Sequence, residues 1–324
     1  AEAAPAPALE RGLGADAQAS NAAGAAWADD WWTSWQKKVG DPVASTARWV
    51  AAQRAREHKH PRRLFADRFA ETLAGQEGFA FRNGEAPIVI SRTKWGDDFT
   101  MDCCYNRGIR QVVNLGAGMD TRAVRLPFPP GVTCFELDKP DLFDIKEPLL
   151  QYMLKPKERR LCNRVVVPVD FERPPPELAG EPDALWAAHL ERSGFDRRAP
   201  SCWILEGLVY YLDPEAVEKT LKRVAELSAP GSMVFFDMVN ANFLLERHAW
   251  HLRDLEAREC PWKWGHNDPA AMLAELGFQA SVIDLRDLEV DRQNGQLVLR
   301  PPISRVPLPR SREALTFYVT AERL

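Results

Sequence analysis

The stretch Asn-Leu-Gly-Ala-Gly-Met-Asp-Thr-Arg occupies residues 114–122, where it follows a short apolar run and opens a predicted helix. Glycine lets the backbone approach a ligand closely, and the amino end of a helix favours polar or anionic groups. Gly116, Ala117 and Gly118 are therefore predicted to form a turn beneath a bound ligand. Thr121 takes the place of the third glycine of the dinucleotide fingerprint. This disfavours a pyrophosphate, and with it an NAD-binding oxidoreductase, and favours a nucleoside ligand without a diphosphate.

Acidic residues stand at the ends of the apolar runs that follow. Phe135-Glu136-Leu137-Asp138 begins nineteen residues after Gly116, and either Glu136 or Asp138 is placed to accept hydrogen bonds from both ribose hydroxyls. Asp170 and Glu206 close the next two runs. In an open α/β sheet, ligands bind outside the carboxyl ends of the strands. The four acids are therefore expected to converge on one ligand site.

The order of apolar runs predicts the fold class. Short runs rich in β-branched and aromatic residues are typical of buried parallel strands, and here they occupy residues 112–115, 132–137, 165–169, 203–205, 233–236 and 280–285, with a final strand expected at 314–321. Helices are predicted over 43–75, 91–107 and 214–227, the last with Asp213 as its N-cap. This alternation predicts an α/β fold, with a doubly wound, mostly parallel seven-stranded sheet and the amino-terminal helices as a lid.

Composition shifts along the chain suggest its organisation. Residues 1–26 are dominated by Ala, Pro and Gly and are expected to be disordered or weakly packed. A single domain is predicted over 27–324, comprising a helical cap and lid at 27–107 and a core at 108–324. Within that core, about 240–268 is an insertion that contributes to an acceptor pocket. Trp27, Trp31 and Trp35 recur at helical spacing, so their face is expected to dock on the core or to roof a pocket.

Charge and hydropathy exclude several classes of partner. The net charge of −4 and the pI of about 6.0 argue against a nucleic-acid surface, which needs basic residues. No run approaches the roughly 20 apolar residues of a membrane helix, so a soluble, cytoplasmic protein is expected. Whether a leader segment preceded Ala1 is left open. The oligomeric state is left undetermined.

No metal or hydrolase signature is found. The six cysteines form no CxxC pair and are expected to be reduced core thiols. His248 and His251 are three residues apart without a third clustered ligand, so no metal is predicted. Walker A, GxSxG and HExxH patterns are missing, which leaves nucleotide hydrolysis, serine hydrolysis and zinc proteolysis without support.

Four runs together resemble the leucine carboxyl methyltransferase family. They are NLGAGMDTR (114–122), FELDKP (135–140), PVDF (168–171) and ILEGLVYYLDPE (204–215). The chain is more similar still to bacterial members described as S-adenosylmethionine-dependent methyltransferases, which also resemble it at TARWVAAQRARE (46–57) and SRTKWGDDF (91–99). The resemblance implies a class I methyltransferase that uses S-adenosyl-L-methionine.

The resemblance also implies roles for single residues around the methionyl part of that cofactor. Arg92 matches an arginine that binds the methionyl carboxylate, although a surface ion pair with Asp97 or Asp98 is the alternative. Glu206, with Gly207 after it, matches a residue near the α-amino group or the sulfonium.

The nucleoside end has its own implied residues. Asp138 matches the ribose-binding aspartate, while the spacing alone keeps Glu136 open. Asp170 and Phe171 match the pair at the adenine edge. Arg48 is the counterpart of a lysine in the first helix of eukaryotic members.

These expectations define a function. A sulfonium methyl is already activated, so the protein mainly has to position a nucleophile. A carboxylate acceptor is ionised at neutral pH and needs no base, whereas a phenol or alcohol does. The nearby Tyr210, Tyr211, His248 and His251 are assigned no role. We expect an O-methyltransferase acting on a small-molecule acceptor, with a carboxylate among the candidate acceptor groups. The alternatives are a protein C-terminal carboxyl methyltransferase and a non-catalytic module that binds the cofactor.

Overall fold

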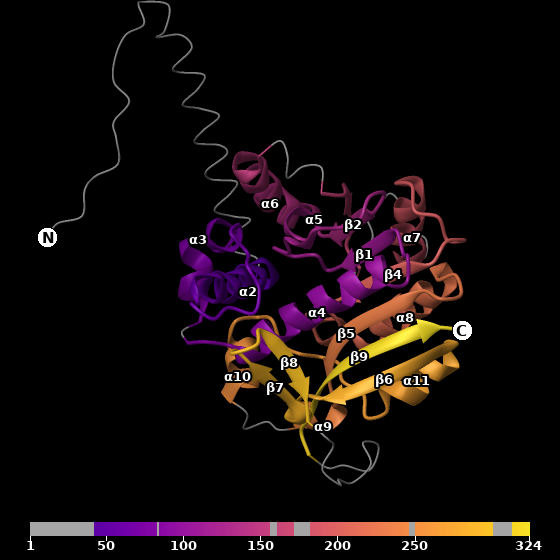
Figure 1. Ribbon diagram of the computed structural model, residues 1–324. Coiled ribbons are helices and arrows are strands. Elements are labelled where there is room, and N and C mark those ends of the chain that lie inside the picture. The colour runs from indigo at the N-terminus through magenta and orange to yellow at the C-terminus, as the bar shows by residue number, and fades with distance from the viewer. Residues whose placement is uncertain (1–41, 83, 156–160, 172–181, 246–249, 301–312) are drawn as a thin grey trace, which may run out of the picture. The chain divides into compact units, whose positions relative to one another are not determined.

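A computed structural model describes residues 42–324 apart from 83, 156–160, 172–181, 246–249 and 301–312 (Figure 1). Residues 42–324 form one unit of the chain. The segment predicted to be disordered at 1–26, and the tryptophan helix predicted from Trp27, lie outside the described residues.

A seven-stranded sheet forms the centre of this unit. In spatial order its strands are β3 (Asn163–Pro168), β2 (Thr133–Asp138), β1 (Gln111–Leu115), β4 (Ser201–Leu205), β5 (Met233–Val239), β9 (Thr316–Arg323) and β6 (Phe278–Asp284). β9 pairs antiparallel with both β5 and β6, and the other pairs are parallel. The strand order reverses between β1 and β4, which sets a topological switch point there. The predicted fold class is confirmed.

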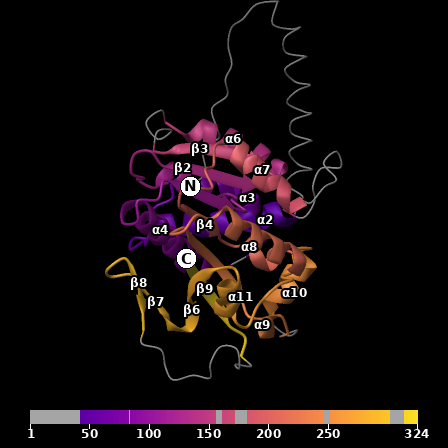
Figure 2. The same cartoon turned by 90° about the vertical axis from the view of Figure 1, so that its right-hand side faces the viewer.

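The central strands are apolar because helices cover both faces of the sheet. β1 and β4 are buried along their whole length. One face packs against α7 (Pro182–Arg192), α8 (Pro214–Leu227) and α11 (Pro269–Glu275), and the other against α4 (Pro87–Tyr105) and α5 (Arg122–Arg125). Figure 2 shows α4 and α8 on opposite sides of the sheet. α6 (Pro140–Met153) packs beside β2.

The amino-terminal helices differ from their predicted bounds. α2 spans Pro42–Lys59, and α3 spans Ala70–Phe81. α3 therefore continues past residue 75, where the first predicted helix ends, because Gly75 adopts a φ of 57° and lets the helix kink there without ending. α4 begins earlier than predicted, at Pro87, because proline in a first turn lacks only an N–H that would be unpaired anyway. α2 and α3 pack so closely that a Cβ on Gly78 would lie 2.4 Å from the Arg48 carbonyl oxygen.

Two further features differ from the predictions made from the sequence. Asp213 precedes α8 as expected, but its side chain makes no capping bond to that helix and contacts Lys263 Nζ at 3.2 Å. A two-stranded hairpin of β7 (Leu288–Asp291) and β8 (Gln296–Leu299) follows the 3-10 turn η4 (Leu285–Asp287) and was not predicted. Between β5 and α11 lie the short helices α9 (Ala241–Leu245) and α10 (Trp250–Ala257). No helix in the described part of the chain is both long and apolar enough to cross a membrane.

Candidate active site

A cavity of about 440 Å³ lies at the carboxyl ends of β1 and β4, beside the switch point. This is the position and size expected of a ligand site in an open α/β sheet. Nine of the ten residues predicted to bind the ligand line it: Arg92, Gly116, Ala117, Gly118, Asp138, Asp170, Phe171, Glu206 and Gly207. The tenth, Glu136, is not among the residues that line the cavity.

The glycine turn forms the floor of the cavity. Gly116 and Gly118 have φ of 68° and 47°, in the left-handed region that favours glycine. The N–H groups of Gly116 and Ala117 donate to the Leu137 carbonyl at 2.9 and 3.0 Å, which ties the turn to β2. A Cβ on Gly116 would meet Leu208 Cδ1 at 2.8 Å. At Gly116 the turn therefore has no room for a side chain.

The two acidic residues of β2 have different surroundings. Asp138 accepts the N–H groups of Gly118 and Lys139, both at 2.7 Å, and burial raises the pKa of its carboxyl. Glu136 accepts from Lys146 Nζ and from Arg164 Nη2, each at 2.7 Å. Burial raises the pKa of Glu136, but these two cations outweigh it and hold the pKa below its usual value. Of the two alternatives, only Asp138 is open to a ligand in the cavity.

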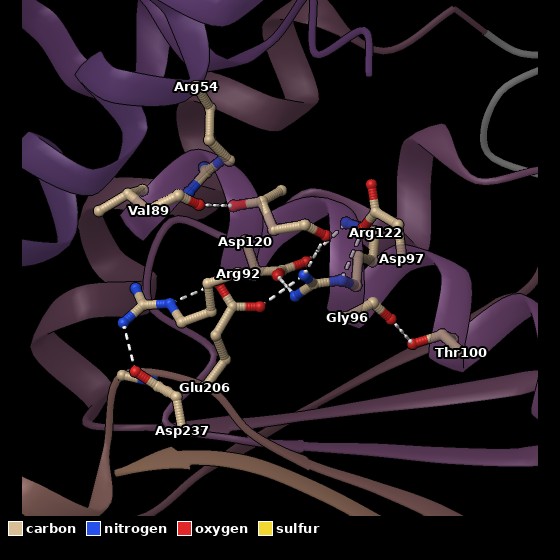
Figure 3. A network of polar contacts seen from close by, with 12 residues as sticks. Arg54, Val89, Arg92, Gly96, Asp97, Thr100, Asp120, Arg122, Glu206 and Asp237 are labelled. Atoms are coloured by element: carbon tan, nitrogen blue, oxygen red, sulfur yellow. Dashed lines mark hydrogen bonds and ion pairs between the residues drawn. The ribbon is translucent and has the colours of Figure 1, made fainter. Parts of the chain in front are cut away.

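Arg92 is held by acids from two neighbouring strands, as Figure 3 shows. Its Nε donates to Glu206 at 3.1 Å, and its Nη1 donates to Asp237 at 2.9 Å and to the Tyr210 hydroxyl at 2.7 Å. The Tyr210 hydroxyl donates in turn to Asp237 at 3.0 Å. Nη2 of Arg92 has no hydrogen-bond partner among the described residues, so one amino group can still donate to a ligand. The alternative pairing with Asp97 or Asp98 is not made, because Asp97 pairs with Arg122 and Asp98 with Lys94.

Arg122 connects Glu206 to the end of the glycine turn (Figure 3). Its guanidinium pairs with Asp97, Asp120 and Glu206, and it is 3% exposed. Burial raises the pKa of Glu206, but the charges of Arg122 and Arg92 outweigh it and keep that pKa below its usual value. By the same balance, with Arg122 as the main attraction, the pKa of Asp120 is lowered to about 2. Both carboxylates are therefore ionised at neutral pH.

We call this side of the cavity the acidic half, comprising Arg92, residues 116–118, Asp120, Asp138, Asp170 and Glu206. The opposite side is the aromatic half, formed by Tyr211 of η3 (Val209–Tyr211) with Phe243, Trp250, His251 and Trp262. Its rings contact one another: Phe243 lies 5.0 Å from His251 and 5.6 Å from Trp262, centroid to centroid. The Trp262 ring also lies 4.3 Å from that of Tyr210, centroid to centroid and tilted by 37°, and this contact joins the two halves.

Comparison with known proteins identifies the family. The family model described as "Leucine carboxyl methyltransferase" matches residues 47–225. The chain belongs to the leucine carboxyl methyltransferase family.

Individual relatives agree with this membership. A "Putative S-adenosyl-L-methionine-dependent methyltransferase" of Mycobacterium avium (strain 104) is 35% identical over 232 residues, which cover 65% of this chain and 70% of that protein. A protein of the same name from Mycobacterium marinum (strain ATCC BAA-535 / M) is 34% identical over 304 residues, covering 84% and 92%. Among solved structures, a putative methyltransferase from Thermobifida fusca YX matches the fold with a TM-score of 0.53 at 18% identity, over 86% of this chain and 94% of its own. This member of the family is an S-adenosylmethionine-dependent methyltransferase.

Several site residues of this methyltransferase were missed from its sequence. Asp237 directly follows the predicted apolar run 233–236, as the other acids follow theirs, and its Oδ1 accepts the Gly207 N–H at 2.7 Å. The same strand-end rule could have found it. Arg122 stands inside the quoted run 114–122, where a buried arginine needs carboxylate partners. Nothing in the sequence says that those partners come from α4 and β4.

Arg54, and not the predicted Arg48, lines the cavity from α2. Arg48 is buried between α2 and α3, contacts Glu77 at 3.4 Å and does not line the cavity. Arg54, six residues later on α2, does line it, and it pairs with Asp67 at 2.9 Å and with the Met119 carbonyl. If a cation of the first helix acts in this member of the family, Arg54 is the residue placed for it.

Residues of the segment 240–268, which was predicted to be an insertion, lie along one side of the cavity. Phe243, Trp250, His251, Leu255 and Trp262 all line it. Of the four residues named without a role, Tyr210, Tyr211 and His251 reach the cavity, and His248 lies outside the described residues.

Proposed function

We propose that this methyltransferase transfers the methyl group of S-adenosylmethionine to an oxygen of a small molecule, and that the oxygen belongs to a carboxylate. The observation that carries the proposal is the two-part cavity, with an acidic half suited to the cofactor beside an aromatic half suited to an apolar acceptor. A cavity of about 440 Å³ favours a small acceptor over a folded protein surface.

The charges of the acidic half fit the cofactor. The ion-pair network around Glu206 contains five carboxylates, namely Asp67, Asp97, Asp120, Glu206 and Asp237, and four guanidinium groups, namely Arg54, Arg92, Arg122 and Arg125. At neutral pH S-adenosylmethionine carries a sulfonium, an ammonium and one carboxylate, and is therefore a cation overall. An excess of one carboxylate complements it.

Each part of the cofactor has a residue of matching chemistry. Nη2 of Arg92 is available to the methionyl carboxylate, and Glu206 to the α-amino group. Asp138 can accept from the ribose hydroxyls, and Asp170 with Phe171, which also line the cavity, would hold the adenine edge. Bound in this way, the cofactor supplies an electrophilic methyl group. The chain's own residues hold the acceptor oxygen in line with it and exclude water.

The ionisation of the lining residues supports a carboxylate as acceptor. Burial raises the pKa of both Tyr210 and Tyr211, so neither phenol is ionised at neutral pH and ready to take a proton. Glu206 and Asp120 are weak bases because their pKa values are lowered. A carboxylate needs no base, since it is already ionised. A phenol or alcohol would have to use His251, the imidazole in the described lining.

The test is a transfer assay with methyl-labelled S-adenosylmethionine and a panel of small carboxylic acids, phenols and alcohols. We expect label in a low-mass product that mild alkali releases as methanol, which identifies a methyl ester. Label that resists alkali would show that the acceptor is a group other than a carboxylate. Label entering protein would favour protein carboxyl methylation, and cofactor binding without any transfer would favour a non-catalytic module.

A further inference from the structure

One arginine beside the aromatic half is not used by the proposed cofactor site. Arg82 follows α3 directly and lines the cavity together with Trp250 and Trp49. The centre of its guanidinium lies 4.2 Å from the centroid of the Trp250 ring and 5.6 Å from that of Trp49. Contact with indole faces fixes the plane of a guanidinium and leaves its N–H groups pointing outward along its edges.

The charge of Arg82 is only partly compensated. Its Nε lies 3.4 Å from Oδ2 of Asp254 on α10, while Oδ1 of the same carboxylate accepts from Arg258 Nε at 3.0 Å. One carboxylate thus serves two guanidinium groups. Glu85 also lines the cavity, but its carboxylate acts with Glu57 in raising the pKa of Arg292, so it is shared with another cation.

Arg82 differs in this respect from the other arginines of the cavity. Arg92 is bound by Glu206 and Asp237, and Arg54 by Asp67 and a backbone carbonyl. In the described part of the chain, Nη1 and Nη2 of Arg82 make no hydrogen bond. These two groups form the edge of a guanidinium that binds a carboxylate through two parallel bonds.

We propose that Arg82 binds a carboxylate of the methyl acceptor through this edge, and that the neighbouring rings pack on the acceptor's apolar or aromatic body. The inference rests on the proposed function, because it places a small acceptor in the aromatic half. It goes further in naming the residue that selects the acceptor by charge. The ligand is an organic acid in which the carboxylate is joined to an apolar group that fits against Trp250, His251 and Trp262.

The test compares two probes of nearly equal shape, 3-phenylpropanoate and 3-phenylpropanamide, on protein saturated with S-adenosylhomocysteine. Calorimetry should give the carboxylate about tenfold higher affinity than the amide, the scale of one charge-assisted hydrogen bond. In Arg82→Gln the carboxylate should lose about tenfold while the amide is unchanged. Arg68→Gln is the matched control, since that guanidinium also stacks on a ring, 4.1 Å from Phe69, but does not line the cavity. It should change neither affinity.

The inference is overturned if the native protein binds both probes equally, if it binds neither while binding S-adenosylhomocysteine, or if the preference survives in Arg82→Gln. Should Arg82→Gln fail to fold, Arg82→Lys keeps the charge but loses the two-bonded edge, and its preference should fall below that of the native protein. The transfer assay tests the proposed function independently of this binding experiment. A retained preference for the carboxylate probe without methylation of any small oxygen acceptor overturns the proposed function alone.

Discussion

The two halves of the cavity differ in how their side chains are held. In the acidic half, Arg92 and Glu206 are held by ion pairs to each other and to Arg122 behind the lining, which connect α4, α5 and the carboxyl end of β4. In the aromatic half, ring contacts and one shared carboxylate, Asp254, hold the side chains. Substituting a single residue of a buried charge network is strongly destabilising, because removing one partner leaves another charge unpaired. A constant ligand therefore suits the acidic half and a variable one the aromatic half.

The largest effect is expected beneath the acidic half, in the buried pair of Lys146 and Glu136. Lys146→Met leaves the Glu136 carboxylate with Arg164 as its cation and should lower the free energy of unfolding by about 3 kcal/mol. Urea unfolding measures it. Lys219→Met, in a pair that lies on the exposed side of α8, should cost roughly 0.5 kcal/mol or less. Equal losses in the two variants would remove the distinction between buried and exposed pairs on which the comparison depends.

Within the acidic half, Arg92→Ala and Glu206→Ala should each weaken the binding of S-adenosylhomocysteine by roughly 1.5 to 3 kcal/mol. This is the scale of a hydrogen bond to a charged group. Calorimetry on the folded variants gives the difference. Unchanged affinity in both variants would show that these residues do not form the cofactor site.

Acid should act on the acidic half through Asp120. The pKa of its carboxyl is about 2 in the folded protein against an ordinary value of 3.8. A carboxyl whose pKa is lowered by folding stabilises the fold when the pH is above its ordinary pKa. That contribution of about 2 kcal/mol is lost as the pH falls from about 4 to about 2. As the pH falls through this range, the free energy of unfolding should decrease more steeply for the native protein than for Asp120→Asn. Parallel curves would contradict the assignment.

The smallest effect on the cofactor is expected from the aromatic half. Trp262→Phe keeps a ring but reduces the contact area, so it should raise the KM for the acceptor several-fold. It should change the affinity for S-adenosylhomocysteine by no more than about 0.5 kcal/mol. A large loss of cofactor affinity would mean that the two halves are not energetically separate.

The sequence predicted the parts of the fold that local pattern determines. Apolar runs located the seven strands of the sheet, and the glycine turn, the acids that end the runs and the family resemblance together named ten ligand-binding residues, of which nine line the cavity. The hairpin β7–β8 escaped because its strands have four residues each and remain largely outside the core. Short, partly exposed strands carry little hydrophobic signal.

The ion-pair network could not be predicted, because its partners are distant in sequence. Arg122 and Glu206 are 84 positions apart, and Arg92 and Asp237 are 145 apart. Glu136 shows the converse difficulty. Its spacing from the glycine turn suited the ribose, yet Lys146 and Arg164 occupy its carboxylate, and neither pairing is visible in the local pattern.

The central claim is that the acidic half binds the cofactor through Asp138 above the glycine turn. Its most direct test is the affinity of S-adenosylhomocysteine for Asp138→Asn and Glu136→Gln, two variants of neighbouring acids on one strand. We predict about a tenfold loss or more in Asp138→Asn, and native affinity in folded Glu136→Gln despite its lower stability. Loss of affinity in Glu136→Gln alone, or no binding by the native protein, would contradict the account.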